Sequence, residues 1–94
     1  MLNLLKDASM EFEGQDFSDV LEIVYGNPSI MMVHSRHSIG TVSIAATLLA
    51  NRFKCCVGIN IRGATWVVQP GDPHRLLAQR WYSYIEGVPI EEQR

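Results

Sequence analysis

The chain has 94 residues, of which 47% are hydrophobic and 19% are charged, and its formal net charge is −2. This length suits one domain with one hydrophobic core and excludes an enzyme whose active site lies between two domains. The longest stretch without a charged residue, 37–51, is shorter than the roughly 20 apolar residues that span a membrane. We therefore expect no membrane partner, and an N-terminus unlike a signal peptide favours a cytoplasmic location.

Charge is unevenly distributed along the chain. Residues 1–26 have a net charge of −5, and residues 27–85 have a net charge of +5. A basic region that also contains aromatic residues is typical of nucleic-acid-binding proteins, although the negative total charge disfavours this hypothesis. The other interpretation is that the acidic segment packs against the basic centre and neutralises it.

The only two cysteines, Cys55 and Cys56, are adjacent in the sequence. Neighbouring side chains of an extended segment point in opposite directions, which disfavours a disulfide between them. Neither cysteine lies in a pattern with zinc-ligand spacing. We therefore predict no metal site and no cofactor, and we interpret both cysteines as small core residues.

Three elements are predicted in the first third of the chain. Residues 2–12 have hydrophobic residues at loosely helical spacing and predict a helix. Residues 17–25 fit either a short helix or a strand, because their hydrophobic pattern suits both periods. Residues 29–33 form a brief apolar run between turn residues, which predicts a buried strand.

The rest of the chain has clearer patterns. A strong helix is predicted after the cap Thr41, because its apolar residues recur at helical spacing. Residues 55–68 alternate in hydrophobicity and predict a hairpin whose turn contains Gly63. A last helix is predicted with Asp72 as its N-cap and Gly87 as its stop.

This order of elements predicts a single α/β or α+β domain over residues 1–94. A helical N-terminus is followed by strand, helix, strand, strand and helix. Because a strand–helix–strand crossover joins parallel strands, we expect a mixed sheet of about three strands. Residues 1–14 are expected to form a peripheral helix or arm, and residues 90–94 to fray.

The loop that precedes the central helix is the candidate ligand site. A helix N-terminus has unpaired N–H groups and about half a positive charge, and Arg36 can bind a phosphate or carboxylate through two hydrogen bonds. The predicted anion-binding residues are His34, Arg36, His37, Ser38, Gly40 and Thr41. The alternative is a polar loop whose hydroxyl groups cap the helix and whose histidines face water.

The segment Val33-His34-Ser35-Arg36 resembles the active-site stretch of the histidine-containing phosphocarrier (HPr-like) family of the sugar phosphotransferase system. In that family an aliphatic residue, His, a small residue and Arg stand before a helix. A later part of the chain also resembles the family, because its residues follow one another in an order similar to that of the family's second and third strands. These residues are Phe53, Val57, Ile59, Gly63 and Trp66-Val67-Val68. Met32 and His37 stand where the family has Gly and Pro. The resemblance implies that His34 carries a phosphoryl group on a ring nitrogen and that Arg36 steadies it.

The leading functional hypothesis is a small non-enzymatic interaction module, an accessory or regulatory protein that binds another protein or a second copy of itself. Tyr82 lies outside the hydrophobic stripe of the last helix, and with Arg75 and Arg80 it is a predicted partner-binding residue. The alternatives are an HPr-like phosphocarrier that uses His34 and a nucleic-acid-binding protein. Outside the phosphocarrier alternative we predict no catalytic residue.

Overall fold

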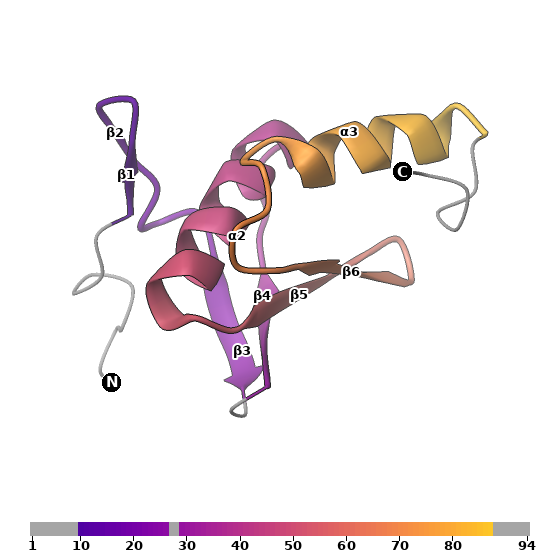
Figure 1. The fold of residues 1–94 in the computed structure, drawn as a ribbon. Helices are drawn as coiled ribbons and strands as arrows, with labels where there is room; N and C mark the ends of the chain where they lie inside the picture. The colour runs from indigo at the N-terminus through magenta and orange to yellow at the C-terminus, as the bar shows by residue number, and fades with distance from the viewer. Residues whose placement is uncertain (1–9, 27–28, 88–94) are drawn as a thin grey trace.

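The structure, a computed structural model, describes residues 10–26 and 29–87 (Figure 1). Its main part is a mixed sheet of four strands in the order β3-β4-β5-β6. A separate two-stranded hairpin, β1–β2, precedes it. The elements are β1 (Glu11–Phe12), β2 (Gln15–Asp16), β3 (Glu22–Gly26), β4 (Ile30–His34), α2 (Ile39–Phe53), β5 (Cys56–Ile61), β6 (Ala64–Val68) and α3 (Leu76–Ile85). The chain therefore forms a small α+β domain.

The crossover from β4 through α2 to β5 organises the sheet. β4 and β5 pair in parallel, from Ile30 opposite Cys56 to Val33 opposite Ile59. The carboxyl ends of both strands therefore lie at one end of the sheet, beside the start of α2 (Figure 1). This is the part of an α/β unit where ligands commonly bind.

A two-residue turn joins β5 to β6, as the sequence predicts. Arg62 has a φ of 52° and Gly63 a φ of 83°, so both residues adopt the left-handed conformation. That conformation matches the twist of a tight antiparallel hairpin, and β5 and β6 pair antiparallel without a break from Ile61 opposite Ala64. The predicted hairpin is confirmed.

The two described helices pack on one face of the sheet, and α2 has more buried residues than α3. Residues 42–47 of α2 are all buried, including the polar Ser43 and Thr47. The Ser43 hydroxyl donates to the carbonyl oxygen of His74 at 2.7 Å and accepts the Ala78 N–H at 3.2 Å. These bonds satisfy backbone groups at the start of α3, which has no side-chain cap from its own N-cap residue. The contact of α2 with α3 is therefore fixed by hydrogen bonds as well as by packing.

His74 joins the β1–β2 hairpin to α2. Its Nδ1 lies 2.8 Å from the Thr47 hydroxyl oxygen, and its ring centroid lies 4.3 Å from that of Phe12 in β1. The Thr47 oxygen also lies 2.8 Å from the carbonyl oxygen of Ile44, to which it donates. One half-buried imidazole therefore holds three segments together.

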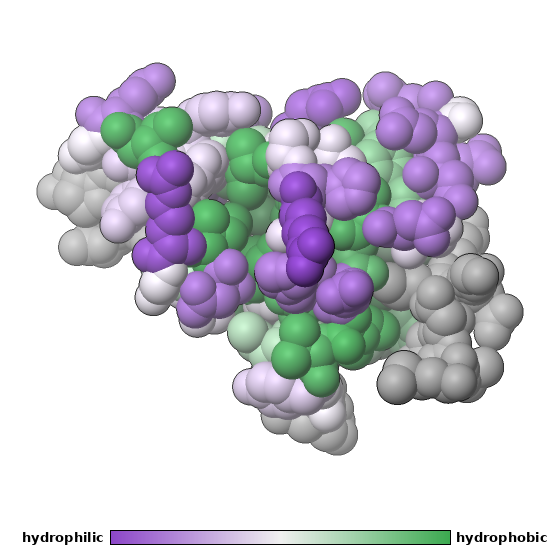
Figure 2. All heavy atoms as spheres, turned by 180° about the vertical axis from the view of Figure 1, so that it is seen from behind, coloured by the Kyte–Doolittle hydropathy of each residue, from purple (hydrophilic) through white to green (hydrophobic). Residues whose placement is uncertain are grey.

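The other face of the sheet has no helix of the described residues packed on it. Across all four strands, one row of side chains on this face consists of Tyr25, Met32, Gly58 and Val67. A Cβ on Gly58 would lie 2.6 Å from the sulfur of Met32, so the thioether occupies the space above this glycine. Tyr25 and Val67 are 59% and 40% exposed. Figure 2 shows that hydrophobic side chains also reach the surface on the side opposite the view of Figure 1.

Several sequence predictions are wrong in detail. The predicted helix 2–12 falls mostly outside the described residues, and its described end belongs to β1 instead. Residues 17–25 include a turn and strand β3, so the strand alternative is correct from Glu22 onward. The main sheet has four strands rather than about three. Neither described helix is long and apolar enough to cross a membrane.

The predicted helix caps are also corrected. The N-cap of α2 is Ser38, three residues before the predicted cap Thr41. The last helix begins at Leu76, and Asp72 instead accepts the Gln69 N–H at 2.9 Å in the turn that leaves β6. The capping pattern alone therefore does not distinguish an N-cap from a residue inside the helix, such as Thr41, or from a residue in a preceding turn, such as Asp72.

Candidate functional site

The start of α2 is open to interaction. Ser38 adopts an extended conformation, and no side chain of the described residues caps the helix. The Ser38 hydroxyl oxygen lies 3.1 Å from that of Thr41, so the two side chains form a hydrogen bond with each other. The first turn contains no acidic residue. The positive end of the helix dipole is therefore not neutralised by the helix itself.

The loop before α2 is anchored by Ser35. Its hydroxyl donates to the carbonyl oxygen of Val20 at 2.6 Å and accepts the His37 N–H at 3.1 Å. These bonds tie the loop to the turn that precedes β3. His34, the last residue of β4, lies opposite Glu22 of β3, which places both side chains on the sheet face away from α2. The predicted anion-binding residues line three different spaces, two of which share His37.

The largest of these, which we call the α2–α3 cleft, has a volume of about 430 Å³. It lies at the carboxyl ends of β4 and β5, between the start of α2 and α3. Its described lining residues are Ser35, His37, Ile39, Val42, Ile59, Asn60, Ile61, Arg62, Trp81 and Tyr82. None of these is acidic, and six of the ten are aliphatic or aromatic. Its volume lies within the range of known ligand pockets.

Arg62 is held at this cleft by Trp81. Its guanidinium carbon lies 5.7 Å from the centre of the indole ring, which is the geometry of a cation–π contact. Trp81 is itself fixed by edge-to-face packing on Trp66 and by a tilted contact with Tyr84. No carboxylate of the described residues lies within ion-pair distance of Arg62. Because Arg62 is also exposed, its N–H groups can bind an anion.

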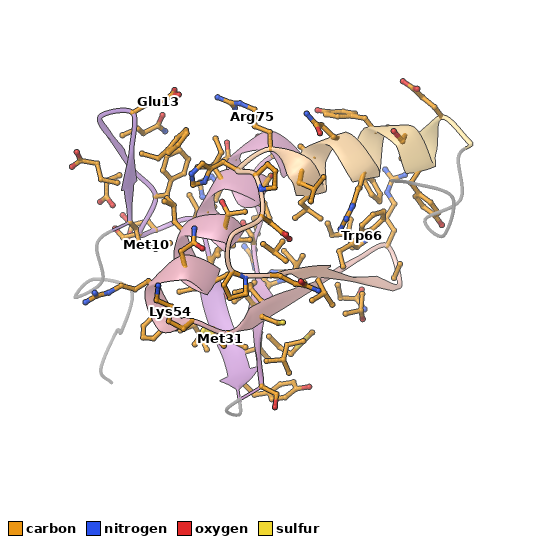
Figure 3. The ribbon with its side chains drawn as sticks, in the orientation of Figure 1. Met10, Glu13, Met31, Lys54, Trp66 and Arg75 are labelled. Carbon is orange, nitrogen blue, oxygen red and sulfur yellow. The ribbon has the colours of Figure 1, made fainter. Side chains whose placement is uncertain are left out.

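The aromatic cluster under the cleft has an unusual polar atom. The indole Nε1 of Trp66 is buried, and it has no hydrogen-bond partner among the described residues. Trp66 does not line the α2–α3 cleft, so this donor is not a contact for a ligand there. Trp66 lies between β6 and α3 (Figure 3), where its ring packs against that of Trp81.

A second space, the hairpin cavity, has a volume of about 330 Å³ and lies on the other side of the α2 start. Ser38, Gly40 and Thr41 line it, together with residues of the β1–β2 hairpin. Arg75 contributes a cation, but its guanidinium lies 4.0 Å from the Glu13 carboxylate, and both side chains are exposed (Figure 3). The negative charge of Glu13 opposes an anion in this cavity.

A third space, the β3–β4 pocket, is the smallest at about 150 Å³. His34 and Arg36 line it beside the carboxylates of Asp19 and Glu22. A phosphoryl group on His34 would therefore lie among acidic side chains, which repel it. The phosphocarrier hypothesis for His34 stays a prediction, and the neighbouring carboxylates of Asp19 and Glu22 count against it.

Asp16, at the end of β2, is an acid whose pKa is lowered by its neighbours. The Ser18 backbone N–H and the Ser18 hydroxyl donate to its two carboxylate oxygens at 3.0 and 2.8 Å. These hydrogen bonds favour the charged carboxylate and lower the pKa of Asp16 below 3.8. The hairpin end of the molecule therefore keeps this negative charge in mildly acidic solution.

The predicted partner-binding residues are also separated. Tyr82 is 52% exposed and lines the α2–α3 cleft, which His37 of the predicted anion loop also lines. Arg75 lines the hairpin cavity, whereas Arg80 is half-buried and lines none of the three spaces. Sequence reasoning missed Arg62 as a site residue, because its partner Trp81 comes from another element. The signal that could have identified Arg62 is the predicted two-residue turn, because this turn places Arg62 at the end of the sheet.

The basic side chains do not form one continuous face. Lys54 lies at the C-terminal end of α2 and Arg75 near its N-terminal end (Figure 3). Trp66 and Trp81 are 3% and 9% exposed, so neither is available to stack on a base. In the described residues the acidic segment makes one ion pair with the basic centre, that of Glu13. This arrangement gives little support to nucleic-acid binding or to neutralisation through ion pairs.

Cys55 and Cys56 are free and half-buried. Within residues 10–26 and 29–87, no three His, Cys, Asp or Glu side chains are placed to hold a metal ion. Comparison of the chain with family models, curated proteins and solved structures finds no significant match.

Proposed function

We propose that the protein is a non-enzymatic interaction module whose α2–α3 cleft binds a segment of a protein partner. The segment carries an aliphatic or aromatic side chain next to a carboxylate. The observation that supports this most is an acid-free cleft in which the Arg62 guanidinium lies over the face of Trp81.

The cleft provides two complementary surfaces for such a segment. Ile39, Val42 and Ile59 offer an apolar floor for a side chain, and its burial there is favourable because apolar area leaves water. Arg62 and the uncapped start of α2 both favour negative charge at the rim. Tyr82 is exposed beside them, and tyrosine is common at the centres of protein interfaces.

The same surroundings favour binding over catalysis. His37 is the cleft residue best suited to proton transfer, and a catalytic imidazole usually has a carboxylate or another group that orients it. The described residues that line the cleft include no Asp or Glu. His37 also lines the β3–β4 pocket with Asp19 and Glu22, but among the described residues neither carboxylate lies within ion-pair distance of its ring. The cleft therefore has the groups for recognition without those for general acid–base chemistry.

An unbiased selection tests this proposal. Phage-displayed random peptides are selected on the immobilised full chain, and the enriched peptides are synthesised and titrated by calorimetry. We expect enrichment of sequences with Asp or Glu, or a free C-terminal carboxylate, next to a large apolar residue. Enrichment of basic peptides, or of none, would contradict the proposal.

Matched variants localise the binding. Arg62→Gln removes the cleft cation and should weaken the selected peptide at least about tenfold, since it loses a charge-assisted hydrogen bond. Arg52→Gln removes an exposed cation near the other end of α2 and should leave the affinity within about twofold. Equal losses in the two variants would show that overall charge rather than the cleft attracts the peptide. Tyr82→Ala should weaken binding without unfolding the chain, because the side chain is mostly exposed.

A further inference from the structure

The sheet has two edge strands, β3 and β6, and they differ in how well they resist pairing with another strand. An edge strand exposes unpaired N–H and C=O groups, and proteins usually protect such an edge with a charge, a proline or a bulge. β3 carries Glu22 and an irregular register between Ile23 and Tyr25. β6 has the sequence Ala-Thr-Trp-Val-Val and has none of these features.

The register of the β5–β6 hairpin identifies which backbone groups of β6 point outward. In a two-residue hairpin the residues that flank the turn, here Ile61 and Ala64, form a hydrogen-bonded pair. Hydrogen-bonded and non-hydrogen-bonded pairs alternate from there, so Trp66 also bonds to β5. The N–H and C=O groups of Thr65 and Val67 therefore point away from β5, and both residues are exposed.

We propose that β6 pairs antiparallel with β6 of a second copy of this chain, which joins the two sheets into one of eight strands. A two-fold axis at Trp66 places Thr65 opposite Val67 of the second copy, and Val67 opposite Thr65. Both are then hydrogen-bonded pairs, so four hydrogen bonds form, and Trp66 meets its counterpart in the non-hydrogen-bonded position between them.

The chemistry of the strand favours a second copy as the occupant. The outward groups are symmetric about Trp66, which is what a two-fold contact between identical strands requires. β6 carries no charge, so two copies meet along it without repulsion between like charges. Its exposed residues, Thr65 and Val67, are β-branched and suit a paired strand. The inference is independent of the proposed function, because neither residue lines the α2–α3 cleft.

Sedimentation equilibrium of the full chain over micromolar to millimolar concentration tests the pairing. We expect the mass to rise from 10.6 kDa toward twice that value. Val67→Lys places two like charges beside the two-fold axis and should weaken the dimer at least about tenfold. Val24→Lys is the matched control, because Val24 is 63% exposed on the other edge strand and should leave the dissociation constant unchanged.

Hydrogen exchange identifies the strand directly. The Thr65 and Val67 amides should exchange more slowly as the protein concentration rises, whereas the Trp66 amide is already protected by β5. Thr65→Pro removes an outward N–H and no bond to β5, so it should weaken the dimer about thirtyfold. A chain that stays at 10.6 kDa throughout overturns the proposal. So does a dimer in which the Thr65 and Val67 amides gain no protection, or one that Val24→Lys weakens as much as Val67→Lys.

Discussion

The two larger cavities lie on opposite sides of the same helix start but differ in charge. The α2–α3 cleft has Arg62 and no acid among its described lining residues. The hairpin cavity has Arg75, and its cation faces Glu13 at 4.0 Å. Both use the first turns of α2, so the helix dipole alone does not distinguish them. The elements that face the helix decide which side can accept a carboxylate.

This contrast also explains why the histidines are poor guides to the site. His34 lies among carboxylates in the β3–β4 pocket, and His74 is a structural bridge between Phe12 and Thr47. Of the three, only His37 lines the acid-free cleft, and it also lines the β3–β4 pocket. The chemical type of a side chain shows what it can do, and its neighbours decide whether it does so.

The largest expected effect is a loss of stability at the β1–β2 hairpin that leaves binding at the α2–α3 cleft unchanged. His74→Ala removes the bond to Thr47 and the contact with Phe12, so we expect the free energy of unfolding to fall by about 2 kcal/mol. Chemical denaturation measures this loss. Because no residue of the β1–β2 hairpin lines the cleft, the affinity of the folded variant for the acidic peptide should stay unchanged.

His34→Ala is the matched control for that substitution. The His34 side chain is exposed at the end of β4, so its removal should change the free energy of unfolding by no more than about 0.5 kcal/mol. An equal loss of stability in both variants would show that the bridge through His74 contributes nothing specific. Faster exchange of the Phe17 amide, which donates to the Met10 carbonyl, should accompany His74→Ala alone.

Much of the central fold could be predicted from the sequence because its signals are local. Helix α2 has a long hydrophobic pattern, and the β5–β6 hairpin combines alternation with Gly63 in a tight turn. The parallel pairing of β4 with β5 follows from the crossover rule. These features need no information from distant residues.

The remaining features depend on tertiary contacts. Capping patterns suggest Asp72 as the start of the last helix, but Ser43 of α2 satisfies the Ala78 N–H there instead. The β1–β2 hairpin has strands of two residues, which are too short for a hydrophobic period to reveal. Arg62 becomes a candidate site residue only when α3 brings Trp81 beneath it.

A smaller effect is expected when the cleft is given the charge of the other cavity. Asn60 lines the α2–α3 cleft, and its side-chain oxygen accepts the Gly63 N–H at 3.2 Å. Asn60→Asp keeps that acceptor and adds one negative charge, so it should weaken the acidic peptide about fivefold to tenfold. Calorimetric titration at low and high salt measures the loss, which should shrink as salt screens the charge. An unchanged affinity would mean that the absence of acid is irrelevant to the cleft.

The smallest expected effect comes from the reverse change in the hairpin cavity. Glu13→Gln removes the partner of Arg75, and because that ion pair is exposed and 4.0 Å long, the free energy of unfolding should fall by less than about 0.5 kcal/mol. The substitution changes the net charge by one unit, as Asn60→Asp does, but in the opposite direction and outside the cleft. If location governs recognition, the acidic peptide should bind Glu13→Gln within about twofold of the unmodified chain. A gain as large as the loss in Asn60→Asp would instead assign the attraction to net charge, and the difference between the two cavities would then carry no functional meaning.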